Sequence, residues 1–433
     1  MSTRAFVSFP VSDLNKLKQQ VLNWSAQFNT CCFLDNQQYK SPTHSFECVV
    51  AAGEISRLET GAGTAFEQLR LFSSKQNDWL FGHFSFDLKS ETESVPSGHP
   101  DQIGFPDLFF FIPEIVVLLN HDRLSIGLMN GNHDQVLNAI QNEPVNGTRE
   151  RQKPVTLRQR IQKEEYLDLI EKLKGHILFG DCYEINFCQE FYAEQADIDP
   201  IPLFKALTRV SPSPFSACYT VDGKYLLCAS PERYLKRKED LILSQPIKGT
   251  APRDLQNKMN DEKLKQDLFT SEKDRTENVM IVDLVRNDLS RICKPDTVKV
   301  EELFGIYSFP QVHQMISTVQ GSLKAGLDWT EMIAATFPMG SMTGAPKKRV
   351  LELIEQYEKT KRGLFSGAVG YVNPNQDFDF NVVIRSLLYN RHNRYLACFA
   401  GSGITIGSDP EKEYEECIVK MAAIEELLKN PAG

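Results

Sequence analysis

The chain has 433 residues, of which 41% are hydrophobic and 24% are charged. This is the composition of an ordinary globular protein that is long enough to bury a large core. The net charge of −9 argues against a nucleic-acid binder and means that an anionic substrate needs a locally basic site or a metal. No apolar run is long enough to cross a membrane, and the first residues lack the apolar core of a signal peptide.

The ten cysteines are scattered along the chain and form no C-x-x-C pair. This spacing disfavours a zinc or redox site. We therefore expect reduced thiols and a cytoplasmic protein.

The first third of the chain alternates predicted strands and helices. Residues 4–9 predict a strand, and 11–28 predict a helix with a buried apolar stripe. The stretch from Gln141 to Arg160 has few large apolar residues and is rich in Arg, Gln, Asn and Pro, which predicts a linker. We expect an N-terminal subdomain over 1–145 and a second region over 155–433, interlocked with the first. Further strands and one helix are expected at 47–55, 63–75, 79–89 and 107–120.

The second region mixes helices with long strands. A helix followed by Gly180 leads to a strand over 180–191. Residues 261–291 predict one long helix or a broken pair, and 340–360 predict a glycine-rich turn that begins a helix. Expected strands, the last three at the short spacing of an antiparallel sheet, lie at 211–221, 224–235, 312–321, 363–372, 378–389 and 394–407.

Lys248 lies between Ile247 and Gly249, where a lysine gains little by solubility alone. A lysine in a partly apolar cleft can lose its proton near neutral pH and attack carbon. The alternative is a turn whose lysine points into water, as most lysines do.

The sequence predicts where the last helix begins, since Ser408 or Asp409 can cap it and Pro410 fits its first turn.

The same helix combines acidic and basic residues on one face. Glu413, Glu416 and Lys420 are spaced i, i+3 and i+7. Two carboxylates so placed suit a hard cation such as magnesium. The alternative is an exposed Glu416–Lys420 pair, worth only about 0.2–0.5 kcal/mol.

Four long motifs follow one another in the second region: PIKGTAPR (246–253), EKDRTENVMIVDLVRNDLSR (272–291), FPMGSMTGAPKKR (337–349) and AGSGITIGSDPEKEYEECIVK (400–420). In this order they resemble the chorismate-utilising enzymes, among them anthranilate, aminodeoxychorismate, isochorismate and salicylate synthases. The resemblance covers the chain from about Ile161 to its end and, more weakly, the part before. It implies an α+β fold of two stacked, mostly antiparallel sheets flanked by helical layers.

The resemblance also assigns roles to residues. Lys248 would be a covalent nucleophile, since a lysine in PIKGT is typical of aminodeoxychorismate synthase component I, where anthranilate synthases usually carry alanine. Glu232 would be the general acid that helps the 4-hydroxyl of chorismate to leave; its alternative is a surface pair with Arg233 or Lys236. Magnesium would be held by Glu277, Glu413 and Glu416, with Asp274 as a secondary candidate. The implied substrate contacts are Thr250, Thr343, Tyr371, Arg385, Gly401, Gly403 and Lys420.

Some of these assignments have alternatives. Thr343, Gly344 and Lys347 are placed to line an anion site at a helix N-terminus. For Glu277 the alternative is a helix face whose acidic groups pair with Lys273 and Arg275. For four of the implied substrate contacts the alternative is an ordinary structural role in a sheet: Tyr371, Arg385, Gly401 and Gly403.

The expected function is the amination of chorismate at C4, with ammonia from a separate glutamine amidotransferase subunit. Anthranilate synthase component I is the alternative, disfavoured by Lys248, by Gln314 in place of a histidine, and by Leu34-Asp35-Asn36 where that enzyme usually carries a tryptophan-binding Leu-Glu-Ser. We interpret those three residues as a surface turn. Isochorismate or salicylate synthase is disfavoured by Glu184, which replaces a water-activating lysine. A catalytically inactive scaffold for an amidotransferase is a further alternative.

Overall fold

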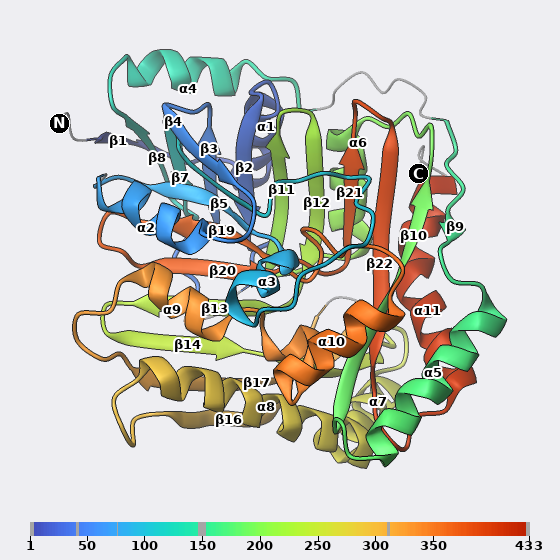
Figure 1. The fold of residues 1–433 in the computed structure, drawn as a ribbon. Coiled ribbons are helices and arrows are strands. Elements are labelled where there is room, and N and C mark those ends of the chain that lie inside the picture. Colours follow the sequence, from blue (N-terminus) through green and yellow to red (C-terminus); the bar gives the residue numbers. More distant parts are fainter. Residues whose placement is uncertain (1–3, 40–42, 76, 146–152, 310–311, 430–433) are drawn as a thin grey trace.

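Two antiparallel sheets form the centre of the molecule in the computed structural model, which describes residues 4–39, 43–75, 77–145, 153–309 and 312–429 (Figure 1). The strands of one sheet run vertically in Figure 1, and most strands of the other run across it. Helices cover the outer faces of both sheets. The expected α+β architecture of stacked antiparallel sheets is confirmed.

The larger sheet has 12 strands among these residues. All of its strand pairs are antiparallel, and β9 (Arg158–Gln159) pairs with β10 at one edge. Its strand order is β1 (Ala5–Pro10), β8 (Arg123–Leu128), β7 (Ile115–Leu119), β3 (Cys48–Ala52), β2 (Thr30–Asp35), β11 (Phe215–Val221), β12 (Lys224–Ser230), β21 (Ser386–Asn390), β22 (Tyr395–Ile404), β10 (Glu184–Ala193) and β18 (Gly344–Ala345).

The smaller sheet has 10 strands within the described ranges. Here β16 (Lys299–Ser308) pairs with β17 outside the main order. The order is β15 (Ile247–Pro252), β17 (Val312–Ser322), β14 (Leu241–Gln245), β13 (Arg233–Lys238), β20 (Phe378–Val382), β19 (Ala368–Val372), β5 (Leu80–Phe84), β6 (Leu108–Ile112) and β4 (Ser56–Thr60).

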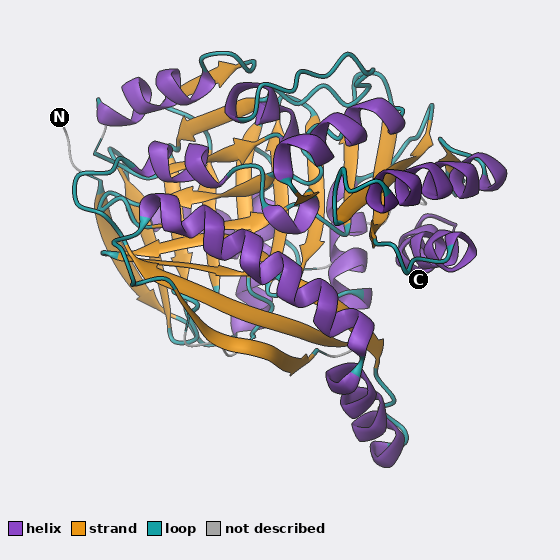
Figure 2. Ribbon diagram, turned by 60° about the horizontal axis from the view of Figure 1, so that its bottom comes forward, coloured by secondary structure: helices purple, strands orange, loops and turns teal. Residues whose placement is uncertain are grey.

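The helices form two outer layers. α1 (Leu14–Ser25), α5 (Lys163–Leu178), α6 (Pro200–Val210) and α11 (Pro410–Lys429) pack on the larger sheet. α2 (Ala65–Ser74), α8 (Glu272–Ile292) and α9 (Trp329–Thr336) cover the smaller sheet, and Figure 2 shows this layer crossing the strands. The remaining helices are α3 (Lys89–Thr92), α4 (His133–Gln141), α7 (Lys258–Thr270), α10 (Lys347–Tyr357) and the 3-10 turns η1 (Phe86–Leu88) and η2 (Gly340–Met342).

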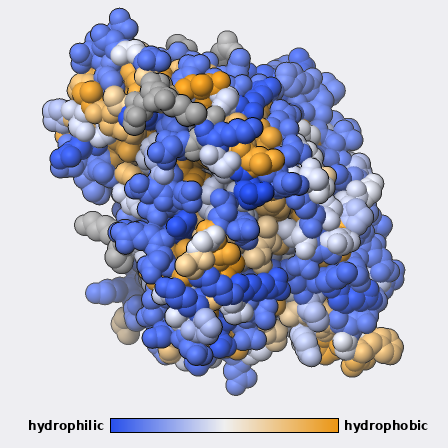
Figure 3. Space-filling view, turned by 60° about the vertical axis from the view of Figure 1, so that its left-hand side comes forward, coloured by the Kyte–Doolittle hydropathy of each residue, from blue (hydrophilic) through white to orange (hydrophobic). Residues whose placement is uncertain are grey.

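The core between the sheets is mainly apolar and aromatic, with a few polar links. His83 of β5 and Tyr219 of β11 face each other across it, and Nδ1 of His83 lies 2.9 Å from the Tyr219 hydroxyl. Burial lowers the pKa of His83 to about 4, so the ring is neutral and fits the apolar interior. On the face shown in Figure 3 the surface is mainly hydrophilic, and apolar side chains gather only in small groups.

Both sheets run through the two expected regions of the chain. In the larger sheet β2 pairs with β11, and in the smaller sheet β5 pairs with β19. The predicted linker from Gln141 to Arg160 lies partly outside the described residues; of it, α4 ends at Gln141 and β9 occupies Arg158–Gln159.

The chain crosses between the sheets at several points, and two of these crossings are adjacent. Residues 378–389 were expected to form one strand, and that prediction is wrong: β20 belongs to the smaller sheet and β21 to the larger one. Arg385, with φ 50°, turns the backbone between them. The second crossing runs from β12 to β13 through Glu232. The two crossings are hydrogen-bonded, since Ala229 N donates to Arg385 O at 3.2 Å and Val382 N donates to Glu232 O at 3.0 Å.

The structure confirms the expected helix ends of two functional motifs. Asp409 caps α11, with its side chain accepting from Lys412 N at 3.1 Å, and Pro410 begins the helix. The stretch 261–291 is a broken pair, in which Ser271 ends α7 and caps α8 through Asp274 N. All ten cysteines are buried and free. No helix of the described residues has the length and apolar character that a membrane span needs.

Candidate active site

Lys248 and Glu184 form an ion pair that joins the two sheets. Nζ of Lys248 donates to Oε1 of Glu184 at 2.8 Å, and the side chains are 11% and 1% exposed. Lys248 lies where the pairing of β15 with β17 shifts between Ile247 and Thr250, and Gly249 there has φ 91°. This shift in the strand pairing places the side chain of Lys248 next to Glu184, the first residue of β10.

The surroundings of Lys248 are acidic. Burial favours the neutral amine, but the carboxylates of Glu184, Glu277 and Glu232 outweigh burial and raise the pKa of Lys248 above the ordinary lysine value. The prediction of a partly apolar cleft that would free the amine is therefore wrong for the protein without substrate. The prediction of a solvated lysine is wrong as well, because the side chain is nearly buried.

Glu232 lies at the crossing from β12 to β13 and is 4% exposed. Burial raises the pKa of Glu232 to about 7, although Ser341 donates to its carboxylate and the charges of Lys248 and Arg385 oppose the rise. The suggested surface pairing is absent: Arg233 and Lys236 both lie on Asp379, at 2.8 and 3.4 Å. A carboxyl with a pKa near neutrality can donate a proton at physiological pH.

Arg385 occupies the neighbouring crossing, from β20 to β21, and its charge acts on Glu232. With its amide oxygen turned to the guanidinium, Gln314 of β17 accepts from Nη1 and Nη2 of Arg385 at 3.1 and 2.8 Å. Burial lowers the pKa of Arg385, against the charge of Glu232, and the group stays cationic at neutral pH. His313 points the other way, toward Asp261 at 3.1 Å, because neighbouring residues of a strand face opposite sides.

Gly403 of β22 gives the ion pair its space. A Cβ at this position would lie 2.6 Å from Oε1 of Glu184 and 2.8 Å from Nζ of Lys248. Gly401 packs against Phe187 and Cys188 of β10, and its carbonyl accepts from Lys420 at 2.7 Å. Only Gly403 of these two therefore borders the Lys248–Glu184 pair.

Two glutamates from different helices lie beside this pair. Glu277 of α8 and Glu413 of α11 are 8% and 1% exposed. Oε1 of Glu277 and Oε2 of Glu413 are buried without a hydrogen-bond partner, which is costly unless a cation or ligand binds them. Burial raises the pKa of Glu277 to about 7, because the ammonium groups of Lys248 and Lys273 do not fully compensate.

Lys273 partly neutralises these carboxylates. Its Nζ lies 3.3 Å from Glu413 and 3.9 Å from Glu277, so the alternative pairing suggested by the sequence exists in this state. Glu416 and Lys420 form the other suggested pair, at 2.6 Å. In the described part of the chain no three acidic, histidine or cysteine side chains already surround one point as a metal site would require. The chemistry of the donors fits magnesium, because Glu277 and Glu413 each have a buried carboxylate oxygen without a hydrogen-bond partner.

Three expected ligand residues are engaged elsewhere or turned outward. The Thr343 hydroxyl donates to the carbonyls of Met339 and Gly340, within its own turn. Lys347 forms a buried ion pair with Asp288 at 2.8 Å, so it lines no anion site at the N-terminus of α10. Thr250 is exposed on β15. Thr343 and Lys347 thus stabilise the fold around the site.

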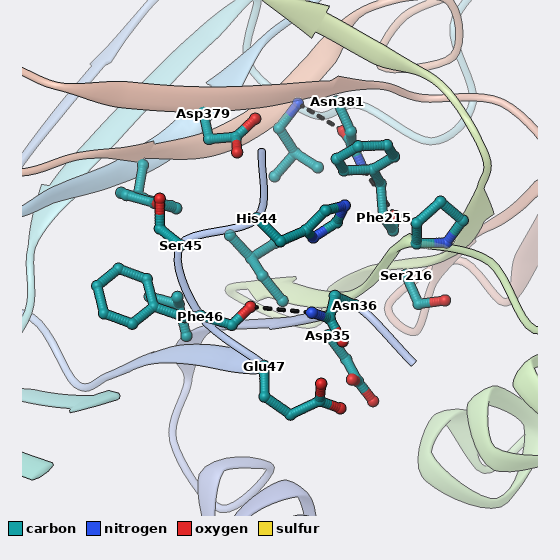
Figure 4. Close-up of a pocket in the computed structure, with 15 residues that line it drawn as sticks. Asp35, Asn36, His44, Ser45, Phe46, Glu47, Phe215, Ser216, Asp379 and Asn381 are labelled. Atoms are coloured by element: carbon teal, nitrogen blue, oxygen red, sulfur yellow. Dashed lines mark hydrogen bonds between the residues drawn. The ribbon is translucent and has the colours of Figure 1, made fainter. Parts of the chain in front are cut away.

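Tyr371 lines a cavity to which Lys248 does not contribute. It lies on β19 against Trp79 and Phe81, and His44 and Asp379 line the same cavity. Figure 4 shows this cavity, with His44 in its centre and Asp379 at one side. This position disfavours the expected contact between Tyr371 and the substrate of Lys248, which stays a prediction.

The same cavity corrects the interpretation of residues 34–36. Asp35 ends β2 and Asn36 follows it, and both are buried at 6% and 8% exposure. Asp35 pairs with Lys18 at 2.6 Å, and Lys18 also contacts Glu47 at 2.7 Å. Residues 34–36 line the cavity (Figure 4) and are not a surface turn.

Ser341 had no role in the sequence prediction, and Lys273 was suggested only as a partner of the acidic helix face around Glu277. Ser341 donates to Glu232 from η2, and Lys273 contacts the α11 carboxylate. Both lie inside the quoted motifs, so position within a motif was the available signal. Their partners, however, come from distant parts of the chain.

Residues 29–426 match the protein family described as chorismate binding enzyme. The chain belongs to this family. It is 35% identical to aminodeoxychorismate synthase component 1 of Klebsiella aerogenes over 356 residues, which covers 81% of this chain and 77% of the relative. It is 31% identical to anthranilate synthase component 1 of Aquifex aeolicus, over 81% of this chain and 74% of that protein.

The fold is shared with a solved family structure. Anthranilate synthase component I from Streptococcus pneumoniae superimposes with a TM-score of 0.78 at 24% identity, covering 90% of this chain and 94% of that one. At this identity the likeness concerns the fold alone.

Proposed function

We propose that the chain converts chorismate and ammonia into 4-amino-4-deoxychorismate. The observation that carries the proposal is the place of Lys248: its ammonium lies in a nearly buried site with Glu184 in contact and the charge of Glu232 close enough to affect its pKa. A nucleophile and a carboxyl with a pKa near 7 suit the displacement of a poor leaving group. The similarity to aminodeoxychorismate synthase component 1 supports the same activity.

The residues divide the reaction into two displacements. Lys248 attacks C2 of chorismate as a free amine, and the protonated carboxyl of Glu232 gives its proton to the departing 4-hydroxyl. Ammonia then attacks C4 and expels the lysine from C2. The guanidinium of Arg385 gives two of its N–H groups to Gln314, and the remaining N–H groups can bind a substrate carboxylate with two parallel hydrogen bonds. Lys420 provides a second cation.

Magnesium is part of this proposal. Glu277, Glu413 and Glu416 are the residues that would hold it, and when bound it would neutralise a carboxylate of chorismate. Lys273 would have to release Glu413 for this to happen, because its ammonium now lies on that carboxylate.

Ammonia is proposed to come from a glutamine amidotransferase subunit. The relatives' name, component 1, supports a two-component enzyme. Free ammonium salt replaces the subunit in the test, which therefore needs this chain alone.

The test is product identity. The purified chain is mixed with chorismate, magnesium and an ammonium salt, and the products are separated and weighed. We expect a product that keeps the enolpyruvyl group and becomes 4-aminobenzoate when a lyase is added. Lys248→Ala should abolish it. Anthranilate and pyruvate would instead establish the second candidate, anthranilate synthase component I, which the 31% identity to the Aquifex aeolicus protein favours.

A further inference from the structure

The two oxygens of the Glu184 carboxylate have different environments. Oε1 accepts the hydrogen bond from Nζ of Lys248 at 2.8 Å. Oε2 is buried and has no hydrogen-bond partner. A buried carboxylate with one oxygen on a lysine and the other unpartnered is poorly satisfied for a purely structural ion pair.

The backbone fixes Glu184 on both sides. It begins β10 and pairs with Ala345 of β18, while the next residue pairs with Ile404 of β22. Gly344 approaches the Glu184 carbonyl so closely that a Cβ there would collide with it. Gly403 leaves space for the carboxylate itself. Glu184 is therefore held rigidly against Lys248, as a proton acceptor must be.

We propose that Glu184 is the base that takes the proton from Lys248 when this lysine attacks chorismate. The inference rests on the proposed function and names a further catalytic residue for it. Lys248 cannot attack as an ammonium, and Glu184 is the carboxylate in hydrogen-bond contact with Nζ. The charges of Glu277 of α8 and Glu232 of the β12–β13 crossing also act on the ammonium. They favour its charged form until Glu184 takes the proton.

The step balances in atoms and charge. An Nζ–H bond breaks and its proton moves to Oε1 of Glu184, while the freed lone pair forms the bond to C2. The C1=C2 electrons move to C1–C6, the C5=C6 electrons move to C4–C5, and the C4–O bond breaks. The leaving oxygen takes the proton of Glu232 and departs as water. In the second displacement the protonated Glu184 returns its proton to the departing amine, and Glu232 takes one from the entering ammonia.

The first part of the experiment compares Glu184→Gln and Glu184→Asp with the unchanged chain in the product assay with ammonium salt. Loss of a general base costs about 10²–10⁴-fold, so we expect kcat of Glu184→Gln to fall at least about 100-fold, with Glu184→Asp in between. Glu190→Gln is the matched control: Glu190 lies on the same face of β10 but pairs with Arg160 at 2.8 Å, and its kcat should stay within two-fold.

The second part separates a base from a structural partner. Formate is added to Glu184→Ala, because a small carboxylate can enter the vacated space and accept the proton; we expect kcat to rise at least ten-fold. Acylation of Lys248 by methyl acetyl phosphate, followed by peptide mass spectrometry, should be at least as fast in Glu184→Gln as in the unchanged chain, since the amine loses a partner that keeps it charged.

The outcomes are distinct. If the unchanged chain makes no 4-amino-4-deoxychorismate, the proposed function is overturned and this inference falls with it. If it makes the product and Glu184→Gln does so equally fast, only the role of Glu184 is overturned. The same holds if formate has no effect while the variant still folds, as judged by its melting temperature.

Discussion

The ammonium of Lys273 lies 3.3 Å from Oε1 of Glu413, so a lysine of α8 neutralises a buried carboxylate of α11. The same group lies 3.9 Å from Glu277. A cation bound by these glutamates must displace the lysine or share the carboxylates with it. Lys273 thus competes with any metal ion at this place.

We expect Lys273→Met to bind magnesium at least about five-fold more tightly, since the competing charge is removed. Isothermal titration with magnesium chloride measures this affinity directly. Lys429→Met is the control, because Lys429 pairs with Glu425 near the end of α11, at 2.9 Å. Equal affinities of Lys273→Met and the unchanged chain would show that Glu413 and Glu277 do not hold the metal.

Glu232 gives the reaction a pH dependence. Burial raises its pKa to about 7, and the proposed leaving-group step needs the protonated form. We therefore expect kcat/KM to fall as the pH rises through about 7, and Glu232→Gln to lose turnover at every pH. Rates at saturating ammonium between pH 6 and pH 9 give the profile. A flat profile over this range would remove Glu232 as the acid.

The same group affects stability with a defined sign. Its pKa is higher in the folded chain than in the unfolded one, so the folded state binds more protons between about 4.5 and 7 and the free energy of unfolding falls as the pH rises through this window. Glu232→Gln removes the cost of the buried charge. We expect it to raise the melting temperature at pH 8 but not at pH 4, where both states of the original residue are protonated.

Local sequence signals predicted α11 well. The cap at Asp409, the proline at its start and the face that carries Glu413 are all properties of neighbouring residues. The break between β20 and β21 could not be seen in this way, because Phe378 to Tyr389 is a continuous strand-like pattern. The positive φ of Arg385 arises from the crossing between sheets, which is a tertiary feature.

Only part of the site was predicted, because its contacts are tertiary features as well. The resemblance named Lys248, Glu232 and Glu277, and the structure brings them together. They could not reveal that Glu184, which is 64 positions away in the chain, accepts the hydrogen bond of Lys248. The raised pKa of this lysine is the sum of charges from three elements, so no reading of residues 244–253 alone could give its direction.

Tyr371 and Arg385 allow two possible substrate positions to be compared. Tyr371 lines the cavity of Figure 4, so Tyr371→Phe should leave kcat and KM for chorismate within two-fold. Arg385 faces Glu232, and Arg385→Lys should raise KM at least about ten-fold, because a lysine cannot form the two parallel hydrogen bonds of a guanidinium. Steady-state kinetics on both variants decide this. A large effect of Tyr371→Phe alone would place the substrate in the cavity of Figure 4.

Gly403 tests the geometry of the ion pair without changing any charge. A methyl group at this position would lie 2.6 Å from Glu184 and 2.8 Å from Lys248, so one of the two side chains must move. A shift of about 1 Å in a reacting group costs on the order of 100-fold in rate, and we expect that loss in kcat for Gly403→Ala. Gly407→Ala is the matched control, since a Cβ there meets nothing within 4 Å. Equal rates for both variants at equal melting temperatures would mean that the contact between Lys248 and Glu184 is not needed for turnover.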